Sequence, residues 1–63
     1  MSAIADKLKG NWNTIKGKLK EEYGELTDNE LIYEEGKEDQ LLGSIQKKTG
    51  ATKQELKDFI DGL

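Results

Sequence analysis

The chain has 63 residues and a net charge of −3, and it contains neither cysteine nor histidine. A chain of this length has room for one domain with one small core, and its composition excludes disulfides, thiolate chemistry and zinc sites built from cysteine and histidine. Because the commonest general base is also absent, we expect a protein that is not an enzyme and that uses no cofactor, metal or small-molecule substrate.

No apolar run in the sequence approaches the length of a membrane span. The N-terminal residues become charged at Asp6, which is too early for the apolar core of a secretory signal. We therefore expect a soluble cytoplasmic protein.

Six apolar residues spaced by three or four positions predict a long first helix from about residue 3 to residue 23. These residues are Ile4, Leu8, Trp12, Ile15, Leu19 and Tyr23. Gly24 follows as the expected C-terminal stop. Gly10 and Gly17 lie inside the helix, where a glycine costs about 1 kcal/mol relative to alanine, so they require a separate explanation.

A second, short helix is predicted to begin near Asp28 and to end before Gly36. Thr27 and Glu30 have the spacing of a capping box, in which the two residues satisfy each other's backbone N–H groups. The leucines on either side of the box have the spacing of a hydrophobic staple. We expect Tyr33 to be a partly exposed aromatic residue on this helix.

The third predicted helix runs from Lys37 to Thr49 and stops at Gly50. Its narrow apolar stripe consists of Leu41, Leu42 and Ile45. The fourth helix begins at a second capping box, formed by Thr52 and Glu55. Its apolar positions follow the spacing of a core-facing helix and are Leu56, Phe59, Ile60 and Leu63.

The two halves of the chain are related by an internal duplication. A shift of 26 residues places Gly10, Gly17 and Gly24 on Gly36, Gly43 and Gly50. After a one-residue deletion in the second half, the capping-box segment also matches, with Thr27, Glu30 and Leu31 on Thr52, Glu55 and Leu56. Each half therefore reads as a helix, a glycine stop, a capping box and a shorter helix. This pattern predicts an all-α fold in which residues 1–63 form a single domain of four helices. Two αα-hairpins, at about 3–35 and 37–63, would pack as a compact bundle.

Several segments resemble the CsbD-like family of small bacterial general stress-response proteins. They read "DKLKGNW", "IKGKLKEEYGELTDNEL", "EGKEDQLLGSIQ" and "KQEL" and span Asp6 to about Phe59. The resemblance implies a small helical domain of two roughly orthogonal αα-hairpins, expression under general stress, and no established enzymatic activity or ligand. An aromatic residue often stands in the family where this chain has Thr49.

The lysines of the first helix form two flanks beside its apolar stripe. Lys9, Lys16 and Lys20 share one flank, and Lys7 and Lys18 share the other. Lys9, Lys16 and Lys20 are candidate contacts for anions, which gives the alternative function of a nucleic-acid or anionic-membrane binding module. The competing interpretation is that these lysines pair with the acidic stretch from Glu25 to Asp39, and the negative net charge favours it.

Two other interpretations of the charged and glycine-containing motifs fail on spacing. The glycine–lysine pairs lack the spacing between glycines and the following serine or threonine of a phosphate loop. An EF-hand loop started at Asp28 would place Ile32 and Tyr33 at positions that need an oxygen ligand and a glycine. The acidic stretch is therefore interpreted as a solvated face.

Gly10, Gly17 and Gly43 are predicted to lie opposite the apolar stripes of their helices. Close backbone packing, a flat surface for a macromolecular partner, and deliberately low helix stability remain as explanations, and we favour the last two. The sequence as a whole predicts a non-enzymatic stress-response protein, monomeric or weakly oligomeric, that associates with or protects other macromolecules.

Overall fold

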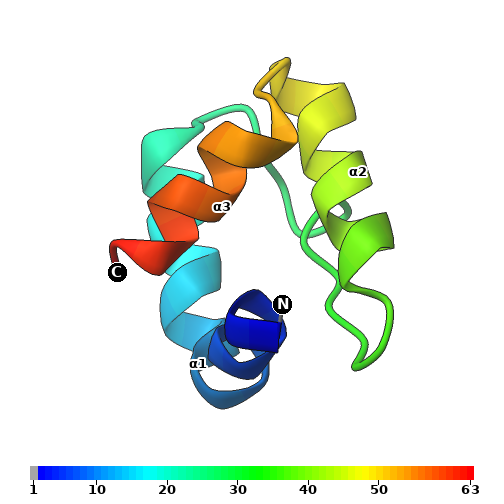
Figure 1. The fold of residues 1–63 in the computed structure, drawn as a ribbon. Coiled ribbons are helices and arrows are strands. Elements are labelled where there is room, and N and C mark those ends of the chain that lie inside the picture. The colour runs from blue at the N-terminus through cyan, green and yellow to red at the C-terminus, as the bar shows by residue number, and fades with distance from the viewer. Residues whose placement is uncertain (1) are drawn as a thin grey trace.

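The computed structural model describes the backbone of residues 2–63 and the side chains of residues 4–63. It contains three helices, α1 (Ser2–Glu22), α2 (Glu38–Thr49) and α3 (Lys53–Asp61). Figure 1 shows α3 lying between α1 and α2, and both of those helices contact it more than they contact each other. The described residues form no strand, so the all-α class is confirmed.

The prediction of four helices in two αα-hairpins is wrong, because the segment expected to be the second helix is not helical. Residues 23–37, which we call the linker, join α1 to α2 through turns and open chain. Within it the capping-box residues close only a single turn, in which Glu30 N–H donates to the Thr27 carbonyl over 3.1 Å and Leu31 N–H donates to the Asp28 carbonyl over 3.1 Å. The chain then continues without helix to the turn at Gly36.

The residues that follow each capping box explain why the two halves differ. After Leu56, the next positions on the same helix face are the apolar residues Phe59 and Ile60, so α3 has a continuous stripe to bury. After Leu31, the equivalent positions are Glu34 and Glu35. A helix there would turn two carboxylates toward the core, whose desolvation costs more than one turn of helix contributes.

Side chains alternate in burial along the open part of the linker instead. Leu31 is 2% exposed, Ile32 is 67% exposed and Tyr33 is packed against the core. Successive side chains of an extended chain point to opposite faces, so Leu31 and Tyr33 face the core together and Ile32 between them faces water. Tyr33 is half-buried as predicted, although it lies in the linker rather than on a helix.

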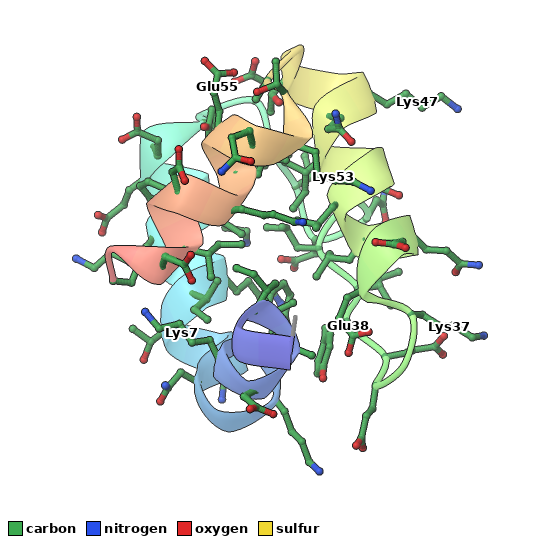
Figure 2. All side chains as sticks on the ribbon, in the orientation of Figure 1. Lys7, Lys37, Glu38, Lys47, Lys53 and Glu55 are labelled. Carbon is green, nitrogen blue, oxygen red and sulfur yellow. The ribbon has the colours of Figure 1, made fainter. Side chains whose placement is uncertain are left out.

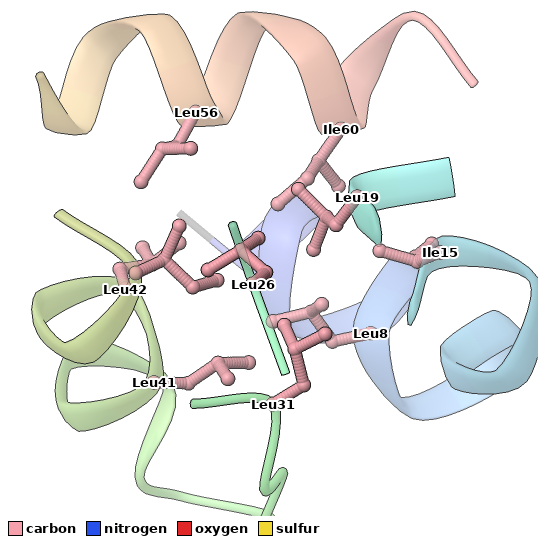
Figure 3. Close-up of a cluster of buried hydrophobic side chains, with 10 residues drawn as sticks. Leu8, Ile15, Leu19, Leu26, Leu31, Leu41, Leu42, Leu56 and Ile60 are labelled. Carbon is pink, nitrogen blue, oxygen red and sulfur yellow. The ribbon is translucent and has the colours of Figure 1, made fainter. Parts of the chain in front are cut away.

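The linker supplies the centre of the core. Figure 3 shows Leu26 and Leu31 between α1 on one side and α2 on the other, with α3 above them. The buried cluster consists of Leu8, Ile15, Leu19, Leu26, Leu31, Leu41, Leu42, Ile45, Leu56 and Ile60. Burying a leucine contributes about 1.5–3 kcal/mol, so the two linker leucines are a large part of the stability of a domain of this size.

The first helix is interrupted by a kink at Asn11, whose φ of −135° and ψ of 32° lie outside the helical region. The preceding residue, Gly10, has a low helix propensity, which reduces the cost of interrupting the helix there. The kink allows Leu8 before it and Ile15 after it to be buried in the same core, at 0% and 2% exposure.

The backbone at the kink reproduces the start of α2. Asn11 falls on Lys37 in the internal duplication, and Lys37 is the N-cap of α2 with φ of −120° and ψ of 36°. The second part of α1 and the whole of α2 are therefore equivalent helices that begin in the same conformation. The part of α1 before the kink has no helical counterpart in the second half, because the residues before Lys37 belong to the linker.

The end of α2 and the start of α3 lie where the glycine and capping-box residues predict them. Gly50 adopts the left-handed conformation with φ of 79° and caps α2, and Thr52 and Glu55 form a complete capping box at the start of α3. Gly36 has φ of 87° in a turn closed by a 3.0 Å hydrogen bond from Lys37 N–H to the Glu34 carbonyl. Positive φ is the reason for glycine at positions 36 and 50.

Lys7 fastens the first part of α1 to the end of α3, a contact that the sequence patterns did not indicate. Its Nζ donates to the carbonyl oxygens of Ile60, Asp61 and Leu63 at 3.2, 2.6 and 3.3 Å. The Asp61 and Leu63 carbonyls accept from no backbone N–H of the described residues, and the Ile60 carbonyl also accepts from Leu63 N–H over 3.2 Å. A cation is favourable at this C-terminal end of a helix.

The linker arrangement predicts opposite outcomes at two neighbouring positions. Leu31→Ala should lower the free energy of unfolding by about 2–5 kcal/mol because it leaves a cavity in the core. Ile32→Ala should change it by less than about 0.5 kcal/mol, since that side chain is solvated. Urea unfolding followed by circular dichroism measures both, and equal losses at the two positions would contradict this placement of the linker.

Candidate functional site

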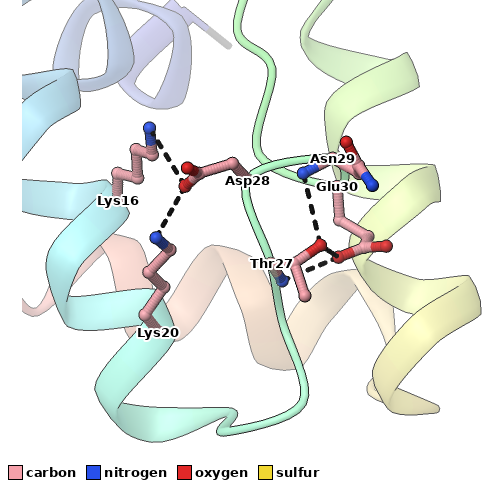
Figure 4. A network of polar contacts seen from close by, with 6 residues as sticks. All are labelled: Lys16, Lys20, Thr27, Asp28, Asn29 and Glu30. Atoms are coloured by element: carbon pink, nitrogen blue, oxygen red, sulfur yellow. Dashed lines mark hydrogen bonds and ion pairs between the residues drawn. The ribbon is translucent and has the colours of Figure 1, made fainter.

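The candidate anion-binding flank is in contact with the linker. Lys16 and Lys20, one turn apart on α1, both approach the same oxygen of Asp28, with Nζ to Oδ1 distances of 3.4 and 2.6 Å (Figure 4). Hydrogen bonds from Lys20 first, and then from Lys16, hold the pKa of the Asp28 carboxyl below its usual value. The two lysines thus place their charge on a carboxylate of the same chain.

The third predicted anion contact, Lys9, is also paired with the linker. Its Nζ lies 3.0 Å from Oε2 of Glu35, and this carboxylate raises the pKa of Lys9. Both side chains are about two-thirds exposed, so water and salt screen the pair strongly. Lys9, Lys16 and Lys20 therefore meet carboxylates at two separate places, and Lys9 is separated from the other two by the kink at Asn11. Their shared flank and phosphate binding by them stay predictions.

The turn that presents Asp28 is held by a network around Thr27 and Glu30. The Thr27 N–H and hydroxyl both donate to Glu30 Oε1 over 2.7 Å, and Asn29 N–H donates to Thr27 Oγ1 over 3.3 Å (Figure 4). Hydrogen bonds from the Thr27 hydroxyl, and then from its backbone, lower the pKa of Glu30. This is a modified form of the box at Thr52, where the threonine hydroxyl accepts from the N–H of Glu55.

The three glycines predicted as a partner surface face open space. A Cβ built at Gly10, Gly17 or Gly43 would have no neighbouring atom within 4 Å. Gly10 and Gly17 are exposed and Gly43 is partly exposed. This excludes close packing against another part of the described chain, and it leaves the partner surface and the low helix stability as predictions.

Two aromatic pairs border the core. Tyr23 and Phe59, predicted to pack in the core, meet edge-on with ring centroids 6.1 Å apart. Trp12 and Tyr33 lie 5.5 Å apart at an angle of 41°, which the sequence analysis missed because it placed Tyr33 on a helix. The Tyr33 hydroxyl is shielded from solvent without a hydrogen-bond partner among the described residues, and burial, followed by the nearby charge of Glu38 and Glu35, raises its pKa.

The described residues contain no group of three or more acidic side chains arranged to hold a metal ion. None of the helices in residues 2–63 combines the length and apolar character needed to cross a membrane. An open hollow of about 380 Å³ lies at the kink and is lined by Lys9, Gly10, Asn11, Trp12, Asn13 and Thr14.

The family is decided by comparison with known proteins. The sequence model of the CsbD-like family matches residues 6–58 of the chain. This protein belongs to the CsbD-like family. That membership confirms the resemblance found from the lysine, glycine and capping-box segments.

The curated relatives of this CsbD-like chain are small bacterial proteins of similar length. The UPF0337 protein YjbJ of Escherichia coli K12 is 46% identical over 57 residues, covering 89% of this chain and 83% of that protein. The UPF0337 protein PA4738 of Pseudomonas aeruginosa is 40% identical over 63 residues, covering 94% and 97%. The UPF0337 protein ECA0631 of Pectobacterium atrosepticum is 47% identical over 60 residues, covering 89% and 87%.

The names of these relatives state no activity. No solved structure matches this CsbD-like chain. Comparison therefore supplies the family and no molecular activity.

The glycine environments predict opposite effects of the same substitution. Gly17→Ala should stabilise the protein by about 0.5–1 kcal/mol, because the site is helical and has free space. Gly50→Ala should destabilise it by about 1 kcal/mol or more, because alanine is strained at a φ of 79°. Thermal unfolding of the two variants tests this, and destabilisation by Gly17→Ala would reveal a packing role for that glycine.

The Asp28 ion pairs predict an acid-sensitive contribution to stability. Because the folded-state pKa of Asp28 lies below its value in the unfolded chain, the contribution is present above the unfolded pKa and is lost as pH falls through the folded pKa. Asp28→Asn should therefore lower the melting temperature at neutral pH and have little effect at about pH 2.

Glu25→Gln is the matched control for Asp28→Asn, since Glu25 is an exposed linker carboxylate without an ion pair among the described residues. It should change the melting temperature little at either pH. A difference between Asp28→Asn and the parent protein that persists at low pH would contradict the ion-pair explanation.

Proposed function

We propose that this protein is a non-enzymatic stress-response protein that acts by associating with other macromolecules or protecting them. Membership of the CsbD-like family supports the stress role, since the resemblance implies expression under general stress. The chemistry of the chain supports the absence of catalysis. It has no histidine, and the hydroxyls of Thr27 and Thr52 serve the two capping boxes.

The observation that carries the proposal is the separation of apolar and charged groups. Among residues 4–63, whose side chains are described, every buried residue is apolar, and the exposed large hydrophobic side chains are those of Ile32 and Leu63. Figure 2 shows charged side chains such as Lys37, Lys47 and Glu55 pointing outward around the helices. A surface with both signs of charge and few apolar patches holds water and remains dispersed at high concentration.

Such a surface suits a molecule that separates other proteins during drying or heating. Dispersed, hydrated molecules keep partly unfolded neighbours from meeting through their exposed apolar surface. This mechanism requires abundance and solubility, and it requires no specific pocket.

The alternative is a nucleic-acid or anionic-membrane binding module that uses Lys9, Lys16 and Lys20. For that function these lysines would have to leave Asp28 and Glu35, with which they are paired. Such binding would weaken steeply with salt, because it would depend on the release of counterions from phosphates.

A protection assay tests the proposed function. A labile enzyme is dried or heated with this protein, with an equal mass of an unrelated small helical domain, or with the variant Leu19→Asp, which places a charge at a core position that is 0% exposed. We expect the parent protein to preserve more activity than the unrelated domain. Equal preservation by the two would reject the protective role, and the unfolded variant reports whether the fold is needed.

A further inference from the structure

The part of α1 before the kink is an addition to the duplicated unit. The repeated helix starts at Asn11 in the first half and at Lys37 in the second, and the residues before Lys37 are linker rather than helix. Residues 2–10, which we call the strap, therefore have no helical counterpart. Figure 1 shows the strap, in dark blue, across the end of the domain where α3 finishes and α2 begins.

The kink separates the strap from the rest of α1. Asn11 has non-helical φ and ψ, so the regular helix is interrupted there. Gly10 and Asn11 are both exposed, and a Cβ at Gly10 would have no neighbour within 4 Å, so packing does not hold this joint. Helix formation is cooperative along an unbroken run, and an isolated helix shorter than about 12 residues is marginal in water. The strap is shorter than this, so its helix depends on contacts with the rest of the domain.

Few contacts fasten the strap. Among residues 4–10 only Leu8 is buried, at 0% exposure, and Ile4 packs partly against the core. Lys7 adds its hydrogen bonds to three carbonyls at the end of α3, at 3.2, 2.6 and 3.3 Å. The ion pair of Lys9 with the linker is exposed and therefore weak. The other buried residues with described side chains all lie after the kink, so most of the core does not belong to the strap.

The strap does not fill the space beneath it. A hollow of about 390 Å³ lies between the strap, the start of α2 and the end of α3, and its lining includes Ile4, Ala5, Glu38, Leu42, Lys57 and Asp61. Side chains that border a hollow lose the van der Waals contacts that close packing would supply. A segment with few buried contacts and incomplete packing has a low free energy of local opening.

We propose that the strap opens as a unit about Gly10 and Asn11 while the rest of the domain stays folded, with Lys7 as its latch. The closed state is the one described above, whose surface has few apolar groups. In the open state the strap loses its helix, Leu42 and the core around Leu8 become exposed, and the end of α3 loses its cation. The strap thus controls how much apolar surface the protein presents. This inference goes beyond the proposed function and does not depend on it.

Amide hydrogen exchange of the whole protein, measured by NMR, is the direct test. The amides of residues 7–10 should exchange at least roughly tenfold faster than those of Leu19 and Ile45, and all at a similar protection factor, because one opening exposes them together. Protection that falls steadily toward the N-terminus would show fraying of the helix end and overturn the proposal. Exchange as slow as that of Leu19 and Ile45 would also overturn it, since the strap would then open only with the whole domain.

A variant outside the strap separates local from global opening. Gly50→Ala changes the cap of α2, at the opposite end of that helix from the strap, and destabilises the closed and open states alike. It should speed exchange of Leu19 and Ile45 by roughly fivefold or more and leave residues 7–10 unchanged. Equal acceleration of all these amides would show a single global unfolding and overturn the proposal.

A variant of the latch should give the other pattern. Lys7→Gln removes the charge that binds the end of α3 and destabilises only the closed state. Both local and global opening start from that state, so residues 7–10, Leu19 and Ile45 should all exchange faster by one factor, roughly threefold to tenfold. Unchanged exchange of residues 7–10 would overturn the latch.

Lys18→Gln is the matched control for Lys7→Gln. Lys18 lies on α1 after the kink, and its ion pair with Glu21 is 3.9 Å long and exposed. This variant should leave the exchange of residues 7–10 unchanged. Acceleration by Lys18→Gln equal to that by Lys7→Gln would show a general effect of lost positive charge and reject the latch.

Discussion

The structure depends on the insertion of two linker leucines between helices that otherwise barely meet. Leu26 and Leu31 occupy the space between α1 and α2, and α3 closes the cluster from the other side. A domain this small has few apolar residues, and a segment without regular structure supplies part of its core. The position of α2 relative to α1 is consequently set by how the linker packs.

The internal duplication accounts for the part of α1 after the kink and for α2, which have the same start. It does not account for the segments after the two capping boxes, since only the second of these is a helix. Both halves repeat the helix start, with Asn11 and Lys37 in nearly the same conformation. Both also repeat a capping box followed by a buried leucine. The halves diverge because only the second one follows that leucine with a further apolar turn.

The electrostatics of the surface follow from the same arrangement. The linker crosses the lysine flank of α1, so Asp28 and Glu35 neutralise the lysines that the sequence offered as anion contacts. Two further carboxylates of residues 31–39 are also paired within the chain: Glu34 Oε1 lies 3.2 Å from Lys37 Nζ, and Asp39 Oδ1 lies 3.6 Å from Lys53 Nζ.

The sequence by itself determined the features that depend on neighbours along the chain. The helical class, the left-handed cap at Gly50 and the capping box at Thr52 depend on residues a few positions apart, and they were predictable from spacing. The family was indicated by a resemblance to known sequences. Most buried positions of the helices were predictable for the same reason, because a helix fixes which residues share a face. The prediction for Leu63 was wrong: α3 ends at Asp61, and the Leu63 side chain is 45% exposed.

Only the tertiary structure decided the path of the linker, the kink at Asn11 and the partners of the lysines. The capping-box residues at Thr27 and Thr52 have the same spacing, but a helix follows only the box at Thr52. The helix forms there because the residues after that box are apolar and can be buried in the core. Likewise, the bond of Lys7 to the end of α3 joins residues more than 50 positions apart. Contacts between distant residues depend on the packing of the whole core, and local spacing carries no information about them.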